Sequence, residues 1–133
     1  TVLIITHEMS VVREVCDSVT LLDRGRIAQS GPIDEVVGDH GSRLARSLVP
    51  LPPAPAAPGR RALELAFGGE TSTSRVLATV GALGEDVEVA TGTIETLAGT
   101  RVGRMRITLP ADAVPDAVQR LRAAGVHVEE VAP

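Results

Sequence analysis

The chain has 133 residues, of which 44% are hydrophobic and 23% charged, a balance typical of a folded globular protein. Its net charge is −4 and Phe67 is its one aromatic residue, so we expect no nucleic-acid partner, because both a basic surface and a base-stacking platform are missing. The chain contains no lysine, which excludes a lysine-containing phosphate-binding loop within these residues. The single cysteine excludes an internal disulfide and a cysteine-rich metal centre, and we expect no metal site.

The hydrophobic runs are too short to cross a bilayer, and the N-terminus lacks the basic and apolar regions of a secretory signal. We therefore expect a soluble protein that meets a membrane only through a partner. The chain begins with Thr1 and enters an apolar run at once, which suggests that an N-terminal part of the same protein precedes it.

A proline-rich stretch at residues 50–59 divides the chain. Proline cannot donate to a sheet or continue a helix, so this stretch predicts a semi-rigid, extended linker. It separates a first part, residues 1–49, from a second part, residues 60–133. The prolines of the stretch are Pro50, Pro52, Pro53, Pro55 and Pro58.

The first part opens with four consecutive apolar residues at 2–5, which predict a strand buried on both faces of a parallel sheet. Ser10 is then the expected N-cap of a helix that continues to Val19. Residues 23–26 predict the turn of a hairpin. Two short helices are expected afterwards, one with Pro32 at its first position and one over residues 43–48.

The second part alternates between strand and helix periodicities. Gly92, inside one predicted strand, suggests a bulge or a close approach of two backbones. The order of elements predicts an α+β ferredoxin-like (βαββαβ) domain, a four-stranded antiparallel sheet with two helices on one face. In chain order the expected elements are a strand at 63–67, a helix at 76–83, strands at 87–97 and 103–109, a helix at 114–124 and a strand from 126.

Short motifs in both parts resemble one protein family. The phrase Ile-Ile-Thr-His-Glu-Met at residues 4–9 and Leu-Leu-Asp-Arg-Gly-Arg-Ile at 21–27 resemble the end of the ATPase domain of ABC transporters. The segments Leu-Glu-Leu at 63–65 and Thr-Gly-Thr-Ile-Glu at 91–95 resemble the NIL domain that is appended to methionine-importer ATPases. The resemblance therefore implies an α/β remnant of the ATPase domain at 1–49, a linker at 50–59 and a NIL-like amino-acid-sensing domain at 60–133.

The resemblance also implies a place in an ATP-driven methionine importer. In such a system two copies of the ATPase chain lie on the cytoplasmic face of the membrane, bound to a transmembrane permease. ATP and magnesium are the cofactors of the complete protein, and none is expected for this chain alone. The NIL domain binds methionine and stops uptake when the cell has enough.

His7 is the one catalytic residue that the resemblance assigns. It matches the switch histidine, which donates a hydrogen bond to the γ-phosphate of ATP and orients the attacking water. The phosphate loop, the signature loop and the catalytic and magnesium-binding carboxylates have no match in these residues, so we expect this chain alone not to hydrolyse ATP. The alternative for His7, from position alone, is a cap on the helix that follows.

The amino-acid site is expected around Glu88, Val89 and Ala90, which align with the Asn-Ile-Leu of the NIL name. Glu88 replaces a neutral amide by an anion, which suits a ligand ammonium and repels a carboxylate. Met105 on the neighbouring strand is a further candidate, because thioethers pack well against one another. The ordinary alternatives are a solvated glutamate and a core methionine.

Four other polar residues have ordinary expected roles. His40 and His127 have no carboxylate or histidine partner at ligand spacing, which favours surface positions. Arg104 and Arg106 share one face of their strand, which indicates a solvated face or pairing with acids of a partner subunit.

Two other function classes stay open. The second part could be a non-catalytic ferredoxin-like module that binds a different amino acid or only dimerises. An independent small-molecule enzyme is disfavoured, because no nucleophile–base pair or metal cluster is found after Arg60.

Overall fold

The computed structural model describes residues 1–54 and 57–131. Pro55 and Ala56, which belong to the expected linker, lie outside the described residues, as do residues 132–133. The two parts of the chain build separate sheets, one with two strands and one with four.

The first part consists of short helices around a hairpin. Ser42 caps the last helix, because its Oγ accepts a hydrogen bond from the main-chain N–H of Ala45 over 3.0 Å. The elements are α1 (Met9–Val15), β1 (Ser18–Asp23), β2 (Arg26–Pro32), α2 (Ile33–Gly38) and α3 (Arg43–Leu48).

The second part has the expected order of strands and helices. Ser72 caps α4, and Gly125, with a φ of 87°, ends α5 in the left-handed conformation that glycine adopts without strain. The elements are β3 (Arg61–Gly68), α4 (Thr73–Gly81), β4 (Glu88–Leu97), β5 (Thr100–Leu109), η1 (Ala111–Ala113), α5 (Val114–Ala123) and β6 (His127–Val131).

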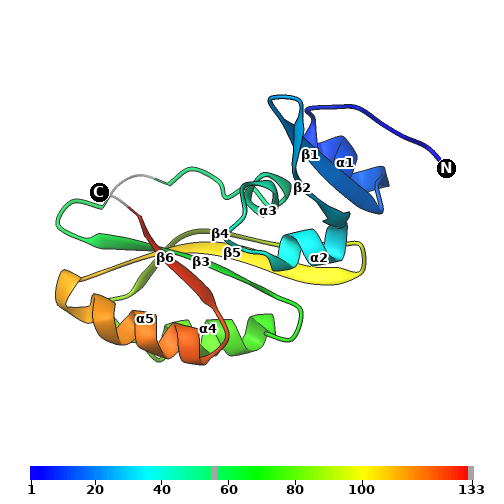
Figure 1. Cartoon of the computed structure of the whole chain (residues 1–133). Coiled ribbons are helices and arrows are strands. Elements are labelled where there is room, and N and C mark those ends of the chain that lie inside the picture. The colour runs from blue at the N-terminus through cyan, green and yellow to red at the C-terminus, as the bar shows by residue number, and fades with distance from the viewer. Residues whose placement is uncertain (55–56, 132–133) are drawn as a thin grey trace.

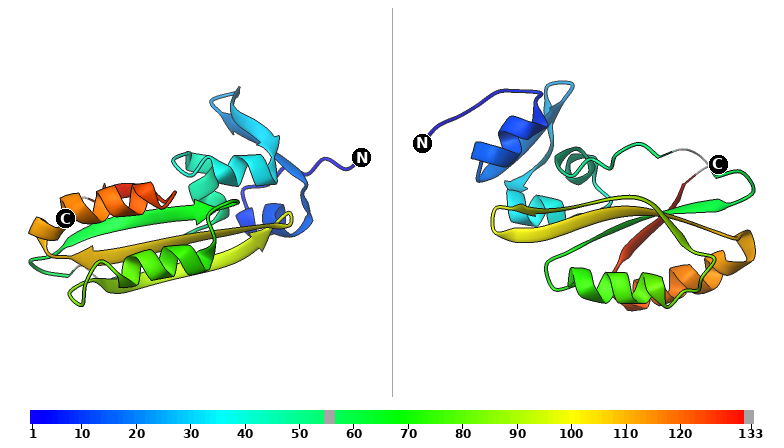
Figure 2. Two further views of the ribbon diagram at one scale, coloured as in Figure 1. Left: turned by 90° about the horizontal axis from the view of Figure 1, so that it is seen from below. Right: turned by 180° about the vertical axis from the view of Figure 1, so that it is seen from behind.

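The four-stranded sheet is antiparallel throughout, with the order β4-β5-β3-β6. This is the ferredoxin-like arrangement that the sequence predicts. Helices α4 and α5 cover one face, and α2 and α3 lie over part of the other (Figure 1). We call this second face the open face. Figure 2 shows the same fold from below and from behind.

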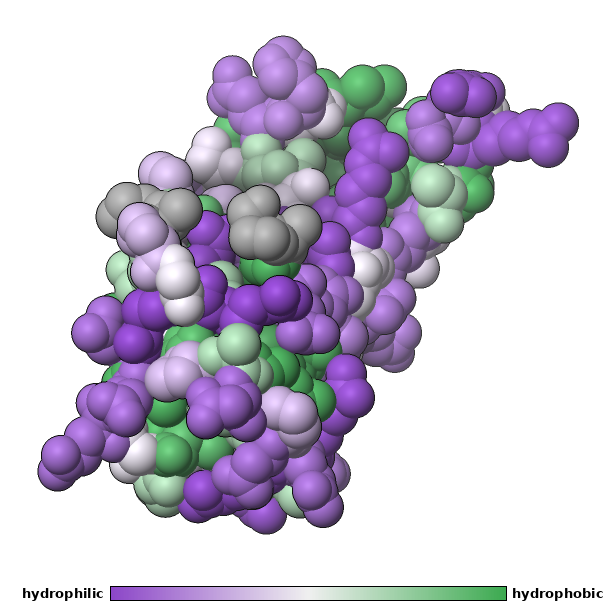
Figure 3. All heavy atoms as spheres, turned by 90° about the vertical axis from the view of Figure 1, so that its left-hand side faces the viewer, coloured by the Kyte–Doolittle hydropathy of each residue, from purple (hydrophilic) through white to green (hydrophobic). Residues whose placement is uncertain are grey.

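The main core lies between the sheet and helices α4 and α5. Alternate residues of β3 and β5 point into it, as the period of two requires. Leu63, Leu65, Phe67 and Ile107 are at most 1% exposed. At the end of the molecule seen in Figure 3, hydrophilic side chains dominate and hydrophobic ones show between them.

A second core joins the first part to the sheet. It contains Ile33, Leu44 and Leu48 from the helices of the first part. Leu97 and Val102 also belong to it, from the ends of β4 and β5 where these two strands meet. The open face is therefore partly covered by the segment that precedes the prolines.

The predicted buried strand at residues 2–5 is wrong. These residues form no strand, and the side chains of Val2, Leu3 and Ile5 are at least 85% exposed. A strand buried on both faces needs strands at its edges and helices over it, and the described residues place none there.

The first helix is also shorter than predicted. It ends at Val15, and Val19 lies in β1, because pairing with β2 continues from Ser18. Its N-cap is Glu8 instead of Ser10. The predicted hairpin is confirmed, with positive φ at Arg24 and Gly25, which suits a two-residue turn.

The second short helix begins at Ile33, one residue after Pro32, and the third matches its predicted range. The bulge expected at Gly92 lies two residues earlier, where the register between β4 and β5 shifts between Val89 and Thr91. A close approach of two backbones occurs elsewhere, at Gly68, where a Cβ would lie 2.9 Å from the main-chain oxygen of Arg101. At Gly103 a Cβ would meet the ring of Phe67.

Candidate functional site

The predicted ligand residues lie on the outer strand of the sheet. Glu88, Val89 and Ala90 are all exposed, and Val89 is 54% exposed although it is hydrophobic. Because β4 is at the end of the sheet order, its outer side is free of a neighbouring strand among the described residues. Unpaired main-chain N–H and C=O groups on such an edge can bind a ligand or another strand.

Met105 lies in a different environment. It is 5% exposed and packs in the main core, opposite Leu65 on β3 and Gly92 on β4. A free amino acid would contact its thioether only if that core opened. The structure thus gives Met105 a core position and leaves the three exposed β4 residues as the accessible part of the predicted site.

His7 is exposed and lies between the exposed run 2–5 and helix α1. The cap expected from its position is absent, since Glu8 is the N-cap residue and it makes no side-chain capping bond. The Oγ1 atom of Thr6 accepts a hydrogen bond from the main-chain N–H of Glu8 instead. The side chain of His7 is therefore available to a group outside the described residues.

The open face carries a charged cluster that the sequence did not predict. Arg104 and Arg106, expected to be solvated or paired with another subunit, both bind Glu64 of the neighbouring strand β3. The nitrogen–oxygen distances are 3.0 Å for Arg104 and 2.5 Å for Arg106. The Arg104 side chain is only 12% exposed. Both arginines thus satisfy one carboxylate within the chain.

Glu64 is ionised because of these neighbours. Burial raises the pKa of its carboxyl, but the hydrogen bond from Arg106 and the charges of both arginines lower it more, so that the pKa lies below its ordinary value.

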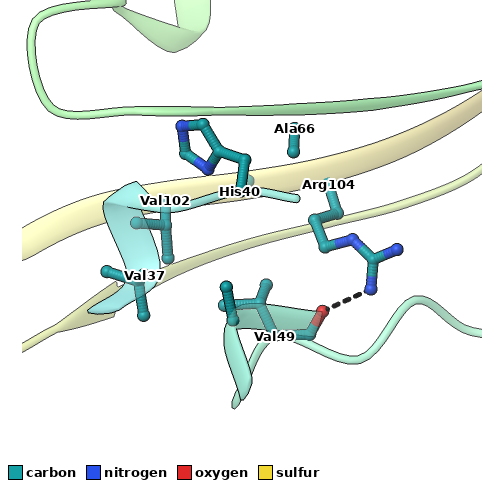
Figure 4. A pocket seen from close by; sticks show the side chains of 8 residues that line it. Val37, His40, Val49, Ala66, Val102 and Arg104 are labelled. Carbon is teal, nitrogen blue, oxygen red and sulfur yellow. Dashed lines mark hydrogen bonds between the residues drawn. The ribbon is translucent and has the colours of Figure 1, made fainter. Parts of the chain in front are cut away.

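Arg104 also reaches the first part of the chain. One terminal nitrogen of its guanidinium binds Glu64, and the other donates to the main-chain oxygen of Val49 over 3.0 Å, the bond drawn in Figure 4. The same nitrogen is 3.4 Å from the main-chain oxygen of Arg46. These carbonyls belong to the C-terminal end of α3, where main-chain oxygens lack helical partners and carry partial negative charge.

Two histidines face each other where the two parts meet. The ring centroids of His40 and His127 are 6.2 Å apart, so the two residues, which have no partner at ligand spacing in the sequence, lie near each other in the fold. Both are partly exposed, which agrees in part with the expected surface positions. Glu129 lies 3.3 Å from His127 and also pairs with Arg46 of α3. Burial and the nearby His127 lower the pKa of His40, against the opposite effect of Asp39. Sequence spacing could not reveal this pair, because the two residues lie in different parts of the chain.

The space between the two parts is too small for an amino acid. A partly open hollow of about 10 Å³ lies there, about the size of one water molecule. His40 and Arg104 are among the side chains around it (Figure 4). Its other lining residues are Val37, Ala45, Val49, Ala66, Val102 and Gly103.

A larger, open groove of about 430 Å³ lies where α5 passes β3 and β6. Its apolar residues are Ala111, Val114, Pro115 and Val118. Its charged residues, Arg61 and Glu130, are paired at 3.5 Å. This groove is the second place at which a small amphiphilic molecule could contact the domain.

The described residues contain no group of three or more His, Cys, Asp or Glu side chains arranged to hold a metal ion. Within the same residues, no helix is both long enough and apolar enough to span a membrane.

The sheet order β4-β5-β3-β6, with α4 and α5 on one face (Figure 1), identifies the second part as a small α+β domain of the ferredoxin-like class. Residues 61–130 match the NIL domain, and the chain belongs to the NIL domain family.

Similar proteins extend the match to both sides of the prolines. The chain is 38% identical over 136 residues to "Methionine import ATP-binding protein MetN" of Streptomyces avermitilis, covering 98% of this chain and 39% of the relative. Relatives with the same name in Myxococcus xanthus and Caulobacter vibrioides are also 38% identical, over 99% and 97% of this chain and 41% and 40% of their own lengths. The chain thus spans about two-fifths of the length of these curated relatives.

Proposed function

We propose that this chain is the C-terminal region of the ATP-binding subunit of a methionine importer, and that its NIL domain binds the amino acid to inhibit uptake. The observation that carries this proposal is the match of similar proteins, named for methionine import and ATP binding, to the first part as well as to the NIL domain. A NIL-like domain that had joined an unrelated segment would match only after the prolines.

In the complete subunit, His7 contacts the γ-phosphate of ATP. Residues outside this chain form the phosphate loop and bind the magnesium ion. Its exposure next to the apolar run 2–5 is compatible with this role. A transmembrane permease and a second copy of the subunit are the expected partners, which places the protein at the cytoplasmic face of the membrane.

The outer edge of β4 is the proposed amino-acid site. The carboxylate of Glu88 pairs with the ligand ammonium, and unpaired main-chain N–H groups of the edge bind its carboxylate. Two copies that pair along this edge would also cover Val89 and Ile94, which are 54% and 44% exposed. The ligand would then lie between two copies, with a hydrophobic wall for its side chain.

Calorimetric titration of the chain with a panel of amino acids tests this proposal. We expect methionine to bind and the Glu88→Ala variant to lose at least tenfold in affinity. The matched control is Glu130→Gln, which alters the groove beside α5 and leaves β4 intact. Loss of binding in the control alone would move the site to that groove. Binding of another amino acid would support the alternative of a module with a different ligand, and no binding at all would support a dimerisation module.

A further inference from the structure

The interface on the open face has two unequal halves. The first part supplies most of the second core, whereas the sheet supplies only Leu97 and Val102 to it. The other links across the interface are polar. They include the ion pairs Arg13–Glu95 and Arg46–Glu129, the hydrogen bonds from Arg104 to the end of α3 and the contact between the rings of His40 and His127.

These polar links differ in their surroundings. The Arg46–Glu129 pair is 44% and 38% exposed, and exposed pairs contribute little to stability. Arg104 is 12% exposed, and its bonds combine a full charge with carbonyls that lack helical partners. Arg104 is therefore the least exposed of the polar links from the sheet to residues 33–49. The Arg13–Glu95 pair, 27% and 23% exposed, joins β4 to α1 instead.

Arg104 does not depend on the interface for its own charge balance. Its second terminal nitrogen binds Glu64 within the sheet, and Glu64 is shared with Arg106. If α3 moved away, Arg104 would keep its carboxylate partner and the sheet would lose no internal bond. The main core, on the opposite face, would also stay intact.

We propose that the open face is a reversible docking surface for the end of the first part, residues 33–49, and that Arg104 is the positioning residue that keeps this segment docked. Docking and release then occur while the four-stranded sheet stays folded. If the proposed function also holds, β5 links the NIL domain mechanically to the end of the ATPase segment, because Arg104 and the β4 partner positions lie on this one strand.

Hydrogen exchange of the whole chain tests the docking. In Arg104→Met, we expect the main-chain amides of residues 46–49 to exchange roughly ten- to a hundredfold faster, the factor that corresponds to one hydrogen bond to a charged group. Amides of β3 and β5 should keep their protection. The matched control is Arg106→Met, which removes the other arginine from Glu64 on the same face and touches no residue of α3. Exchange in α3 should be unchanged in this control.

Two results would overturn the proposal. One is unchanged exchange at residues 46–49 in Arg104→Met, and the other is equal acceleration in both variants, which would mean that loss of the Glu64 cluster loosens the whole chain. If Arg104→Met does not fold, Arg104→Lys replaces it. Lysine keeps a positive charge beside Glu64 but lacks the fork that reaches two partners, so α3 should still exchange faster than in the unmodified chain. No ligand is added in these measurements, so a failure of methionine binding leaves their outcome interpretable.

Discussion

The ring of Phe67 lies directly against Gly103, its register partner on the adjacent strand, and fills the place where a side chain would begin. A Cβ at Gly103 would meet three ring carbons of Phe67, one of them at 3.2 Å. The φ of Gly103 is not in the left-handed region, so backbone conformation does not require glycine here. The requirement comes from packing against Phe67 in the main core.

We expect Gly103→Ala to lower the free energy of unfolding by about 1–3 kcal/mol, the usual cost of overpacking a core. Denaturant titration measures the effect. Gly92→Ala is the matched control, since a Cβ there would make only ordinary contacts, the nearest at 3.5 Å. Equal losses in the two variants would show that the cost comes from replacing a strand glycine and not from the ring of Phe67.

His40 should make the free energy of unfolding depend on pH. A histidine with a lowered pKa takes up its proton less readily in the folded chain than in the unfolded chain. The contribution of neutral His40 to the free energy of unfolding should therefore be fully present above pH 6.5, the ordinary pKa, and should be lost as the pH drops below it. The groups that face His40 are His127 and Asp39, with Glu129, Arg46 and Arg104 around the pair.

Thermal melts of the unmodified chain and of His40→Asn between pH 7.5 and about 5 measure this effect. The variant should lose less stability on acidification. The exposed residue His7 supplies the control, and His7→Asn should behave as the unmodified chain does. If both variants reduce the pH dependence alike, the pair across the interface is not its source.

Glu64 should control stability at lower pH. Its pKa is lower in the folded chain, so its contribution is present above the ordinary value of 4.5 and is lost as the pH falls below it. We expect Glu64→Gln to cost about 1–3 kcal/mol at neutral pH, because two little-exposed arginines lose their carboxylate.

Urea titrations at pH 7 and pH 4 check this prediction, because the difference between Glu64→Gln and the unmodified chain should shrink at the lower pH. Glu130→Gln is the control. It breaks an exposed ion pair at 3.5 Å, which should cost less than about 1 kcal/mol. A difference that does not change with pH would contradict a charged Glu64.

The chain alone should not hydrolyse ATP. Its 133 residues contain no lysine, so the phosphate-binding loop that an ABC-type ATPase needs is not among them. Phosphate release with ATP and magnesium should equal the background rate, both for the unmodified chain and for His7→Ala. A rate above background that disappears in the variant would contradict this prediction.

Much of the ferredoxin-like domain could be predicted because its local signals agree with one another. The period of two in β3 and β5, the caps at Ser72 and Gly125 and the order of elements all indicate the same sheet. The first part was harder, because its opening run has the pattern of a buried strand but not the neighbours that such a strand needs. A short apolar run favours a buried strand, but such a strand forms only where the rest of the chain supplies its neighbours.

The surroundings of the candidate site residues could be predicted only in part. Exposure of Glu88 and Val89 follows from their place on an outer strand, which the fold class already implies. The cluster of Glu64 with Arg104 and the His40–His127 pair depend on which face of the sheet is covered by residues far away in sequence. Alternation shows that Arg104 and Arg106 share a face, but it carries no information about what lies over that face.

Leu97 and Val102 bear on where this protein can be cut. The proline stretch is an obvious place to divide the chain. However, these two side chains, 4% and 3% exposed, are covered by helices that precede the prolines. A shortened protein that starts at Arg60 would expose these two hydrophobic side chains at the tip of the hairpin formed by β4 and β5. Such a truncation should need solubilising substitutions at both positions before it behaves well at high concentration.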